Sequence, residues 1–523
     1  MQIARTLAPA ALAAAALIIV PATQAAAQTH RSDDPVIHRM WQVGIEQSQV
    51  EQLAHILMDS IGPRLAGSPE LASAQDWLVG LYERWGVTAR MEQYGTWPGW
   101  RQGTLHVDLV SPRVQTLEAE LLAWSPGTDG PVEGEVVDFL SLAVGEPEEW
   151  LPKLAGKWVM LLPAEQMCRA PQEARQYARP ETIERLVAER EAAWMAFWTR
   201  EDELGGYYRF RPLLDSSQAL GFLQSWWSEG WGVNKVFDTW TRTKPSLDIG
   251  CEDYGLLARM VRSGMAPRIR VDADAEPLGE VPQFNVIAEL RGTELPDEYV
   301  ILSAHLDSWH AATGATDNGT GTITMLEAMR ILKETYPNPK RTILVGHWGP
   351  EEMGLIGSRA FTEDHADLLD KIQVVFNQDN GTWRFELIEG QGFARAGEHV
   401  TRWIAAVPEE MAEHVTLDFP GPQENQGSDH VSFLCHGVPA FRLQSPYDEY
   451  RQYTWHTNRD TYDKIVFDDL KENATLAAML AYAASEDPER VPRDRVVLPI
   501  DPRTGEPRAW VSCGTARRSA HGR

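Results

Sequence analysis

The chain has 523 residues, of which 43% are hydrophobic and 24% charged, a composition that is typical of a globular protein and excludes disorder for most of the chain. A single hydrophobic core rarely serves so long a chain, so we expect two domains or one enlarged α/β domain with an insertion. The net charge of −27 and the lack of a basic stripe exclude nucleic acid as a partner.

Residues 1–27 are typical of a secretory signal peptide. Arg5 supplies the positive charge, Ala10 to Val20 form an apolar run, and Ala25 to Ala27 offer a cleavage site before Gln28. The apolar run is short for a membrane-spanning helix, and no later run is long enough. We therefore expect a periplasmic or secreted protein without membrane association after cleavage. An uncleaved N-terminal anchor is the alternative.

Four cysteines lie far apart in the chain and show no spacing typical of a zinc ribbon. Export permits disulfides, and four cysteines allow three pairings, so the sequence leaves the pairing open. A protein of this size does not need disulfides to fold, so some of the thiols can be free. The cysteines are Cys168, Cys251, Cys435 and Cys513.

The N-terminal part predicts two amphipathic helices, over residues 36–60 and 71–85, on either side of the turn-rich loop IGPRLAGSPE. Short strands are predicted at 88–94 and 104–110, before the composition changes near residue 125. Further short strands at 136–137 and 158–162 and a charged helical region at 168–205 follow.

Residues 206–240 carry four tryptophans among glycines, namely Trp226, Trp227, Trp231 and Trp240. They fit either a ligand platform or packing inside an insert, and packing is the more common use of such side chains. A helix over 249–261 and a strand over 266–276 end this region.

From residue 282 onward, strands alternate with amphipathic helices. This alternation predicts an α/β fold with a mostly parallel central sheet and helices on both faces. The Pro- and Arg-rich residues after 488 predict a loosely packed tail. The predicted strands cover 283–292, 298–307, 341–348, 371–379 and 439–444, and the predicted helices cover 319–336, 354–365, 399–411 and 469–485.

Three of these strands end in side chains that bind metals. One stops at His305 and runs into a loop that ends in Asp317, and the next is followed by Glu351 and Glu352. A third ends in Asp379. Because ligands bind beyond the carboxyl ends of strands in open α/β sheets, we expect these groups at one edge. His456, in the later loop YTWHTNRD, offers a second imidazole, with Asp460 and Asp463 near it as possible supporting partners.

Each of these residues also has an ordinary explanation. Asp317 could cap a helix, and Asp379 could form a turn. Together, two imidazoles and several carboxylates suit zinc, with manganese or cobalt as substitutes. Of the adjacent Glu351 and Glu352, one can bind metal while the other takes a proton from metal-bound water. Asp307 can orient the ring of His305, since alternate side chains of a strand point the same way.

Five motifs, in this order, resemble family twenty-eight of the metallopeptidases, the co-catalytic di-zinc aminopeptidase and glutamate carboxypeptidase family. The resemblance covers residues 282–485, and the loop IGPRLAGSPE also resembles the N-terminal part of that family. The motifs are HLD at 305–307, TDNGTG at 316–321, EEMGLIGS at 351–358, SDH at 428–430 and WHTNRD at 455–460.

The resemblance implies two zinc ions per chain. One would be held by His305 and Asp379, the other by Glu352 and His456, and Asp317 would bridge them. Glu351 would be the general base and Asp307 the orienting residue, with a cis peptide between Asp317 and Asn318. The SDH loop (Ser428, Asp429 and His430) would line the substrate pocket, and Tyr450 and Tyr453 are the candidates for a tyrosine near the scissile carbonyl.

The resemblance also implies a domain order. Residues 28–125 would be the N-terminal part of the catalytic domain, and 126–278 would be an inserted, β-rich, protease-associated-like domain. Residues 279–488 would form the di-zinc peptidase domain and 489–523 a tail.

The expected function is that of an exported aminopeptidase acting on peptides. A dipeptidase or carboxypeptidase of the same fold is the nearest alternative. A glutaminyl cyclase, which would hold one zinc, and a non-catalytic binding protein are more distant ones. Side-chain preference and oligomeric state stay open.

Overall fold

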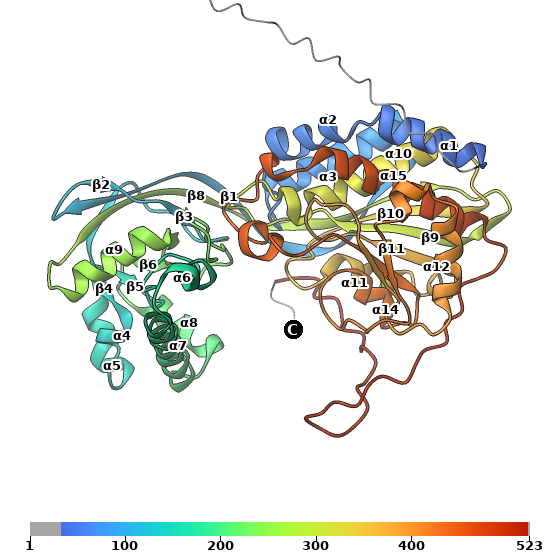
Figure 1. Cartoon of the computed structure of the whole chain (residues 1–523). Helices are drawn as coiled ribbons and strands as arrows, with labels where there is room; N and C mark the ends of the chain where they lie inside the picture. Colours follow the sequence, from blue (N-terminus) through green and yellow to red (C-terminus); the bar gives the residue numbers. More distant parts are fainter. Residues whose placement is uncertain (1–32, 521–523) are drawn as a thin grey trace, which may run out of the picture. The chain divides into compact units, whose positions relative to one another are not determined.

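The computed structural model describes residues 33–520, and its central layer is a sheet whose middle strands are parallel (Figure 1). Strands β9 (Leu295–His305), β10 (Arg341–Trp348), β11 (Ile372–Asn377) and β14 (Ala440–Gln444) lie in the order β14-β11-β9-β10. Every residue of β10, β11 and β14 is buried, because both faces of the sheet are covered. The apolar runs predicted as strands in this part of the chain are confirmed.

Helices cover both faces of this sheet (Figure 1). On one face α10 (Thr320–Thr335) packs against α15 (Phe467–Glu486), and both contact the N-terminal helices. On the other face lie α11 (Ile356–Asp364) and α14 (His430–Leu434). The predicted fold class is therefore confirmed. The smaller elements here are α12 (Ala396–Ala405), α13 (Glu409–Ala412), β12 (Leu387–Glu389), β13 (Thr416–Asp418) and the short helical turns η4 (Ala315–Gly319), η5 (Leu369–Lys371), η6 (Tyr450–Thr454) and η7 (Tyr462–Lys464).

Two long antiparallel strands, β1 (Thr88–Ser111) and β8 (Arg268–Leu290), extend the central sheet through the pairing of β8 with β10. The sequence predicts each as two short strands, which is wrong, because each is continuous. Residues 95–103 (GTWPGWRQG) are typical of a turn, yet pairing continues across them with shifts of register. β-Bulges absorb glycine and proline in this way without ending a strand.

Residues between β1 and β8 build a second region around two further hydrophobic clusters, one of which also includes Leu65 and Trp309. Its strands β4 (Val132–Asp138), β5 (Lys157–Met160), β6 (Gly221–Gln224) and β7 (Ser246–Ile249) pair in parallel beside β8. The predicted insert falls in this region, and its likeness to a protease-associated domain stays a prediction. The other elements are β2 (Gln115–Thr116), β3 (Ala119–Leu121), α4 (Phe139–Leu142), α5 (Pro147–Trp150), η3 (Leu151–Leu154), α6 (Pro171–Tyr177), α7 (Pro180–Glu203), α8 (Tyr207–Ser216) and α9 (Cys251–Arg262).

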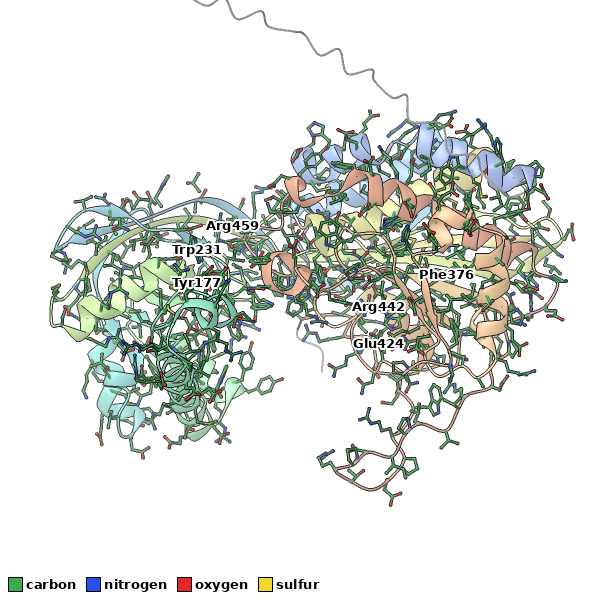
Figure 2. The ribbon with its side chains drawn as sticks, in the orientation of Figure 1. Tyr177, Trp231, Phe376, Glu424, Arg442 and Arg459 are labelled. Atoms are coloured by element: carbon green, nitrogen blue, oxygen red, sulfur yellow. A yellow bond between two sulfur atoms is a disulfide. The ribbon has the colours of Figure 1, made fainter. Side chains whose placement is uncertain are left out.

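The tryptophan-rich segment mostly packs inward. Trp227 and Trp240 are buried, and the ring of Trp226 lies 5.6 Å from that of Phe237. Trp231 differs, since 65% of it is exposed (Figure 2). Packing therefore accounts for three of these four side chains.

The single helix predicted over 36–60 is interrupted at residues 47–49. The reason is a tertiary contact, because the backbone N–H of Gln49 donates to the buried carboxylate of Glu327 over 2.9 Å, and the Ser48 hydroxyl contacts the same oxygen. A buried acceptor can compete with the helix for backbone donors. The pieces are α1 (Pro35–Trp41), η1 (Gln42–Glu46), α2 (Val50–Ala54) and η2 (His55–Ile61), and α3 (Pro69–Arg84) follows as predicted.

All four cysteines are paired, as Cys168–Cys251 and Cys435–Cys513, so of the possibilities that the sequence leaves open the structure has two disulfides and no free thiol. The second disulfide fastens the C-terminal tail, whose described residues 489–520 form no helix or long strand, to the residue after α14. Arg518 adds ion pairs to Glu363 and Asp364 at the end of α11. The tail thus lies against the central fold instead of being loose.

Replacing Cys435 and Cys513 together by serine is expected to lower the free energy of unfolding by up to roughly 4 kcal/mol, because the disulfide closes a loop of 78 residues. Urea unfolding of the two proteins measures the difference. An unchanged midpoint would show that this disulfide contributes nothing to stability.

No helix among residues 33–520 is long and apolar enough to cross a membrane. The predicted signal peptide, residues 1–27, lies outside the described residues.

Candidate metal centre

The parallel strands bring the predicted ligands to one edge of the sheet. β10 pairs with β9, and Trp348 at the end of β10 lies opposite His305 at the end of β9. The turn that follows β10 therefore begins beside the end of β9. β11 pairs with the other side of β9 and ends two residues before Asp379. The arrangement expected from the strand ends is therefore present.

Two clusters of possible metal ligands share one carboxylate. In the first, Nε2 of His305 lies 3.0 Å from Oδ1 of Asp379 and 3.5 Å from Oδ1 of Asp317. In the second, Nε2 of His456 lies 2.8 Å from Oε2 of Glu352 and 3.3 Å from Oδ2 of Asp317. Within each cluster the ligand atoms lie within 4.8 Å of one another. Asp317 thus presents one oxygen to each of the two clusters.

The negative charges of the carboxylates in these clusters favour the binding of cations. Burial raises the pKa of Glu352, and the neighbouring Asp317 raises it further. Oδ2 of Asp317 and Oε1 of Glu352 are buried and have no hydrogen-bond partner among residues 33–520. Buried carboxylates that face one another are costly unless a cation lies between them. Carboxylate oxygens with imidazole nitrogens fit zinc, so the residues present suit the predicted metal.

Asp307 lies behind the first cluster. Its Oδ1 is 3.4 Å from Nδ1 of His305 and accepts the backbone N–H of Glu351 over 2.9 Å. Its Oδ2 accepts the N–H of Glu352 over 3.3 Å. One buried carboxylate therefore orients both the histidine ring and the turn that carries the two glutamates.

The loop that carries Asp317 is held by Asp460. The Asp460 carboxylate accepts the backbone N–H groups of Thr316 over 2.8 Å and of Asp317 over 3.0 Å. The peptide between Asp317 and Asn318 is cis, as the resemblance implies. Asp460 thus positions the shared carboxylate, whereas the sequence predicts it as a partner of His456. Asp463 pairs with Lys464 at the surface and has no part in the centre.

Arg64 is a supporting residue that the sequence did not indicate. Its guanidinium is fully buried and donates to the backbone carbonyls of Leu306, Thr313 and Gly314 over 2.7 to 2.8 Å. These carbonyls belong to the loop between the first histidine and the shared aspartate. The sequence places Arg64 in the turn-rich loop IGPRLAGSPE, and only the fold shows what it contacts.

Arg64→Lys is expected to lower zinc affinity by about 10- to 100-fold, the scale found for residues that orient metal ligands, because an ammonium cannot reach three carbonyls as a planar fork does. Competition with a chromophoric chelator measures the affinity. Arg341→Lys is the matched control, since Arg341 is 1% exposed and also donates to backbone carbonyls, those of Ser485 and Asp487. It should lower stability without changing zinc affinity, and equal losses in both variants would contradict a specific role for Arg64.

A cavity of about 390 Å³ opens beside the two clusters. Glu351 lines it, and burial raises the pKa of the Glu351 carboxyl well above its usual value. Tyr450 lines it too, and burial together with the nearby charge of Asp317 raises the pKa of the Tyr450 hydroxyl well above its usual value. The other lining residues are Asp317, Glu352, Gly354, Leu355, Arg359, Asp379, Asn425, Gln426, Gly427, Arg442, Tyr447, Arg451, Trp455 and His456.

The remaining residues predicted for the substrate pocket do not line this cavity. Ser428, Asp429 and His430 are buried behind it, and the Ser428 hydroxyl accepts a hydrogen bond from Asn377. Tyr453 is 36% exposed. The structure therefore brings only Tyr450 of this set to the cavity.

An ion pair holds Arg442, one of the residues that line the cavity. Oε2 of Glu424 lies 2.7 Å from Nε2 of His430, and Oε1 of Glu424 accepts from Arg442 over 3.0 Å (Figure 2). These partners hold the pKa of the Glu424 carboxyl at about 2, against the effect of its burial. Arg442 is thereby neutralised within the protein.

A loop from the second hydrophobic region reaches the second cluster. The N–H of Val236 donates to the carbonyl of His456 over 3.0 Å, and the ring of Phe237 lies 5.4 Å from the His456 ring. Arg459 donates to the carbonyl of Gly232 over 2.9 Å (Figure 2). Residues far apart in the sequence therefore fix the position of this histidine.

Known proteins resemble the chain in sequence. Residues 285–481 match the model of Peptidase family M28. Carboxypeptidase Q of Mus musculus is 25% identical over 454 residues, which cover 86% of this chain and 88% of that protein. The Glutamate carboxypeptidase 2 homolog of Caenorhabditis briggsae is 31% identical over 250 residues, which cover 42% of this chain and 31% of that protein.

Solved structures resemble it in fold. A peptidase M28 precursor from Shewanella amazonensis SB2B has a TM-score of 0.63 at 24% identity, covering 87% of this chain and 97% of that one. A zinc aminopeptidase from Bacillus subtilis has a TM-score of 0.53 at 17% identity, covering 85% and 96%. At these identities the likeness concerns the fold alone.

Proposed function

Because residues 285–481 belong to peptidase family M28, we propose that the chain is an exported two-zinc exopeptidase that removes the N-terminal residue of peptides. The observation that carries this proposal is the shared carboxylate of Asp317, which faces both ligand clusters. His305 and Asp379 would hold one zinc ion, and Glu352 and His456 the other. The solved zinc aminopeptidase of the same fold supports the choice of metal.

Bound zinc would lower the pKa of a water molecule and polarise the scissile carbonyl. Glu351 would be the general base that takes up a proton from water and returns it to the leaving amine, since it lines the cavity and has no ion-pair partner among residues 33–520. The carboxylate of Asp307 keeps Glu351 in place, because it accepts a hydrogen bond from the backbone N–H of Glu351. Tyr450 would be the donor for the oxyanion, because it lines the same cavity as Asp317 and Glu351.

A dipeptidase is the second candidate. The relative in Mus musculus is a carboxypeptidase, and the solved structure from Bacillus subtilis is an aminopeptidase. The cavity itself favours a substrate with a carboxylate close to the scissile bond, because Arg359 and Arg451 line it and form no ion pair among residues 33–520.

A substrate panel separates these candidates. Alanyl-anilide reports an aminopeptidase, an N-acetylated dipeptide reports a carboxypeptidase, and an unblocked dipeptide reports a dipeptidase. We expect hydrolysis of the substrates with a free α-amine and none of the acetylated one. Hydrolysis of the acetylated dipeptide alone would contradict N-terminal cleavage, and no hydrolysis of any substrate would contradict the proposed function.

Export is proposed from two features. The predicted signal peptide directs the chain out of the cytoplasm, and two disulfides are stable in the oxidising compartments that it leads to.

A further inference from the structure

The segment that carries His456 pairs with a hairpin of the second region, residues 226–236. The backbone N–H of Val236 donates to the carbonyl of His456 over 3.0 Å. The backbone N–H of Asn458 donates to the carbonyl of Asn234 over 3.0 Å, and the side-chain oxygen of Asn458 accepts the N–H of Asn234 over 3.0 Å. The segment of the histidine therefore runs antiparallel beside the second arm of the hairpin.

The backbone of His456 depends on such support. Its φ is 60°, in the left-handed region that residues other than glycine rarely adopt. This conformation is unfavourable for a residue with a Cβ and persists where neighbouring contacts fix it. The hairpin also contacts the preceding residue, because the ammonium of Lys235 lies 3.9 Å from the centre of the Trp455 ring. If His456 relaxed to an ordinary φ, its ring would move away from Glu352, whose Oε2 lies 2.8 Å from it.

One buried carboxylate, Asp248 of β7, holds both arms of the hairpin. It accepts the backbone N–H of Trp226 from the first arm over 3.0 Å, and it accepts a hydrogen bond from the side-chain amide of Asn234 in the second arm. Asp248 and Asn234 are each 2% exposed. Asn234 thus joins the sheet of the second region to the segment of His456, because its side chain bonds Asp248 and its backbone bonds Asn458.

The contact between Asp248 and Asn234 is fixed by the needs of a buried charge. Burial raises the pKa of Asp248 to about 7, and the N–H donors of Asn234, Trp226 and Gln224 oppose this rise. Among residues 33–520, Oδ1 of Asp248 accepts from Asn234 alone, since the other two donors bind Oδ2. A buried carboxylate oxygen without a donor is costly, so the Asn234 amide is held in one position.

We propose that Asn234 is a positioning residue for the zinc ion that Glu352 and His456 would hold, and that Asp248 acts through Asn234. The inference rests on the proposed function, and it adds that the second region is needed to form one of the two metal sites. Asn234 belongs to neither ligand cluster, so its effect passes through the backbone pairing with the segment of His456. The first cluster lies at the ends of the central strands and should not depend on this link.

Asn234→Leu tests the link, since leucine has a similar branched shape but no N–H donor. It is combined with two variants that each leave one cluster intact, namely Asp379→Ala, which leaves the cluster of His456, and His456→Ala, which leaves the cluster of Asp379. Zinc affinity is measured by competition with a chromophoric chelator at about pH 8, above the pKa of about 7 that burial gives Asp248. In the Asp379→Ala protein, Asn234→Leu should lower the affinity at least about tenfold, the scale found for residues that orient metal ligands. In the His456→Ala protein it should leave the affinity unchanged.

Asp248→Ala is the second variant of the link. In the Asp379→Ala protein it should also lower zinc affinity, and adding Asn234→Leu to it should cause little further loss, because both residues act through one contact. In the otherwise native chain, Asn234→Leu should release its more weakly held zinc ion at a lower chelator concentration than the native protein does.

Tyr254→Phe is the matched control. Tyr254 is fully buried in the same region, and its hydroxyl donates to the carbonyl of Leu162 over 2.7 Å. Its replacement removes a buried hydrogen bond without touching the hairpin. It should therefore lower the midpoint of urea unfolding and leave zinc affinity unchanged in every background.

Unchanged zinc affinity after Asn234→Leu, in the native chain or in Asp379→Ala, would overturn the positioning role and leave the two-zinc peptidase intact. An equal loss of affinity in Tyr254→Phe would overturn it as well, since weaker folding of the second region would then explain the effect. A native protein that binds no zinc would overturn the proposed function and this inference together.

Discussion

Glu351→Gln is expected to lower kcat by at least about a hundredfold while the zinc content stays at the native level. Glutamine keeps the size and the backbone contact with Asp307 but cannot accept a proton, and general-base catalysis is worth this much. Glu351 belongs to neither ligand cluster, so its replacement removes no metal ligand. Steady-state kinetics on an unblocked dipeptide and metal analysis of the same sample measure both quantities.

The adjacent glutamate provides the control. Glu352→Gln changes the same chemical group one position further along the turn, but Oε2 of Glu352 lies 2.8 Å from His456 in the second cluster. This variant should lose zinc as well as activity. Near-full activity of Glu351→Gln, or loss of zinc from it, would remove Glu351 from the role of general base.

Asp317→Ala is expected to have the largest effect on the metal centre, with zinc falling below one ion per chain and kcat/KM falling at least about a thousandfold. Its two oxygens face different clusters, at 3.5 Å from His305 and 3.3 Å from His456, so its loss weakens both sites together. A metal ion supplies several kcal/mol of transition-state stabilisation, which corresponds to this change in rate.

Asp379→Ala is the matched comparison, because Asp379 belongs to the first cluster alone. It should lose one ion and keep the other. If Asp317→Ala retained two zinc ions, the carboxylate would not be shared, and the two clusters would have to be separate sites.

Local sequence was sufficient for the parts of the centre that lie at strand ends. His305, Asp379 and the two glutamates follow apolar runs directly, and parallel pairing then brings them together. Asp317 and His456 lie in loops. Only the order of the five motifs connected these two residues with the other metal ligands.

The supporting residues could not be predicted because their contacts join distant parts of the chain. Arg64 binds carbonyls about 240 to 250 positions away, and Lys235 reaches Trp455 from another hydrophobic region. An isolated arginine in a turn-rich loop or a lysine among tryptophans has no local pattern that indicates such a partner. The broken helix at residues 47–49 has the same cause, since the hydrogen bond from the Gln49 backbone N–H to Glu327 depends on the packing of α10.

The long strands β1 and β8 were missed for a different reason. Glycine and proline usually end a strand, and both strands contain them. Here each strand has the other as a partner along nearly its whole length, so a bulge costs less than a break would.

The central claim is that one carboxylate, Asp317, serves two zinc ions in a peptidase. The most direct test is the zinc content of the freshly purified, active protein, determined by mass spectrometry of the metal together with amino-acid analysis of the protein. Two zinc ions per chain, with activity lost on chelation and regained when zinc is returned, is the predicted result. One zinc ion per chain at full activity, or full activity without metal, would contradict the claim.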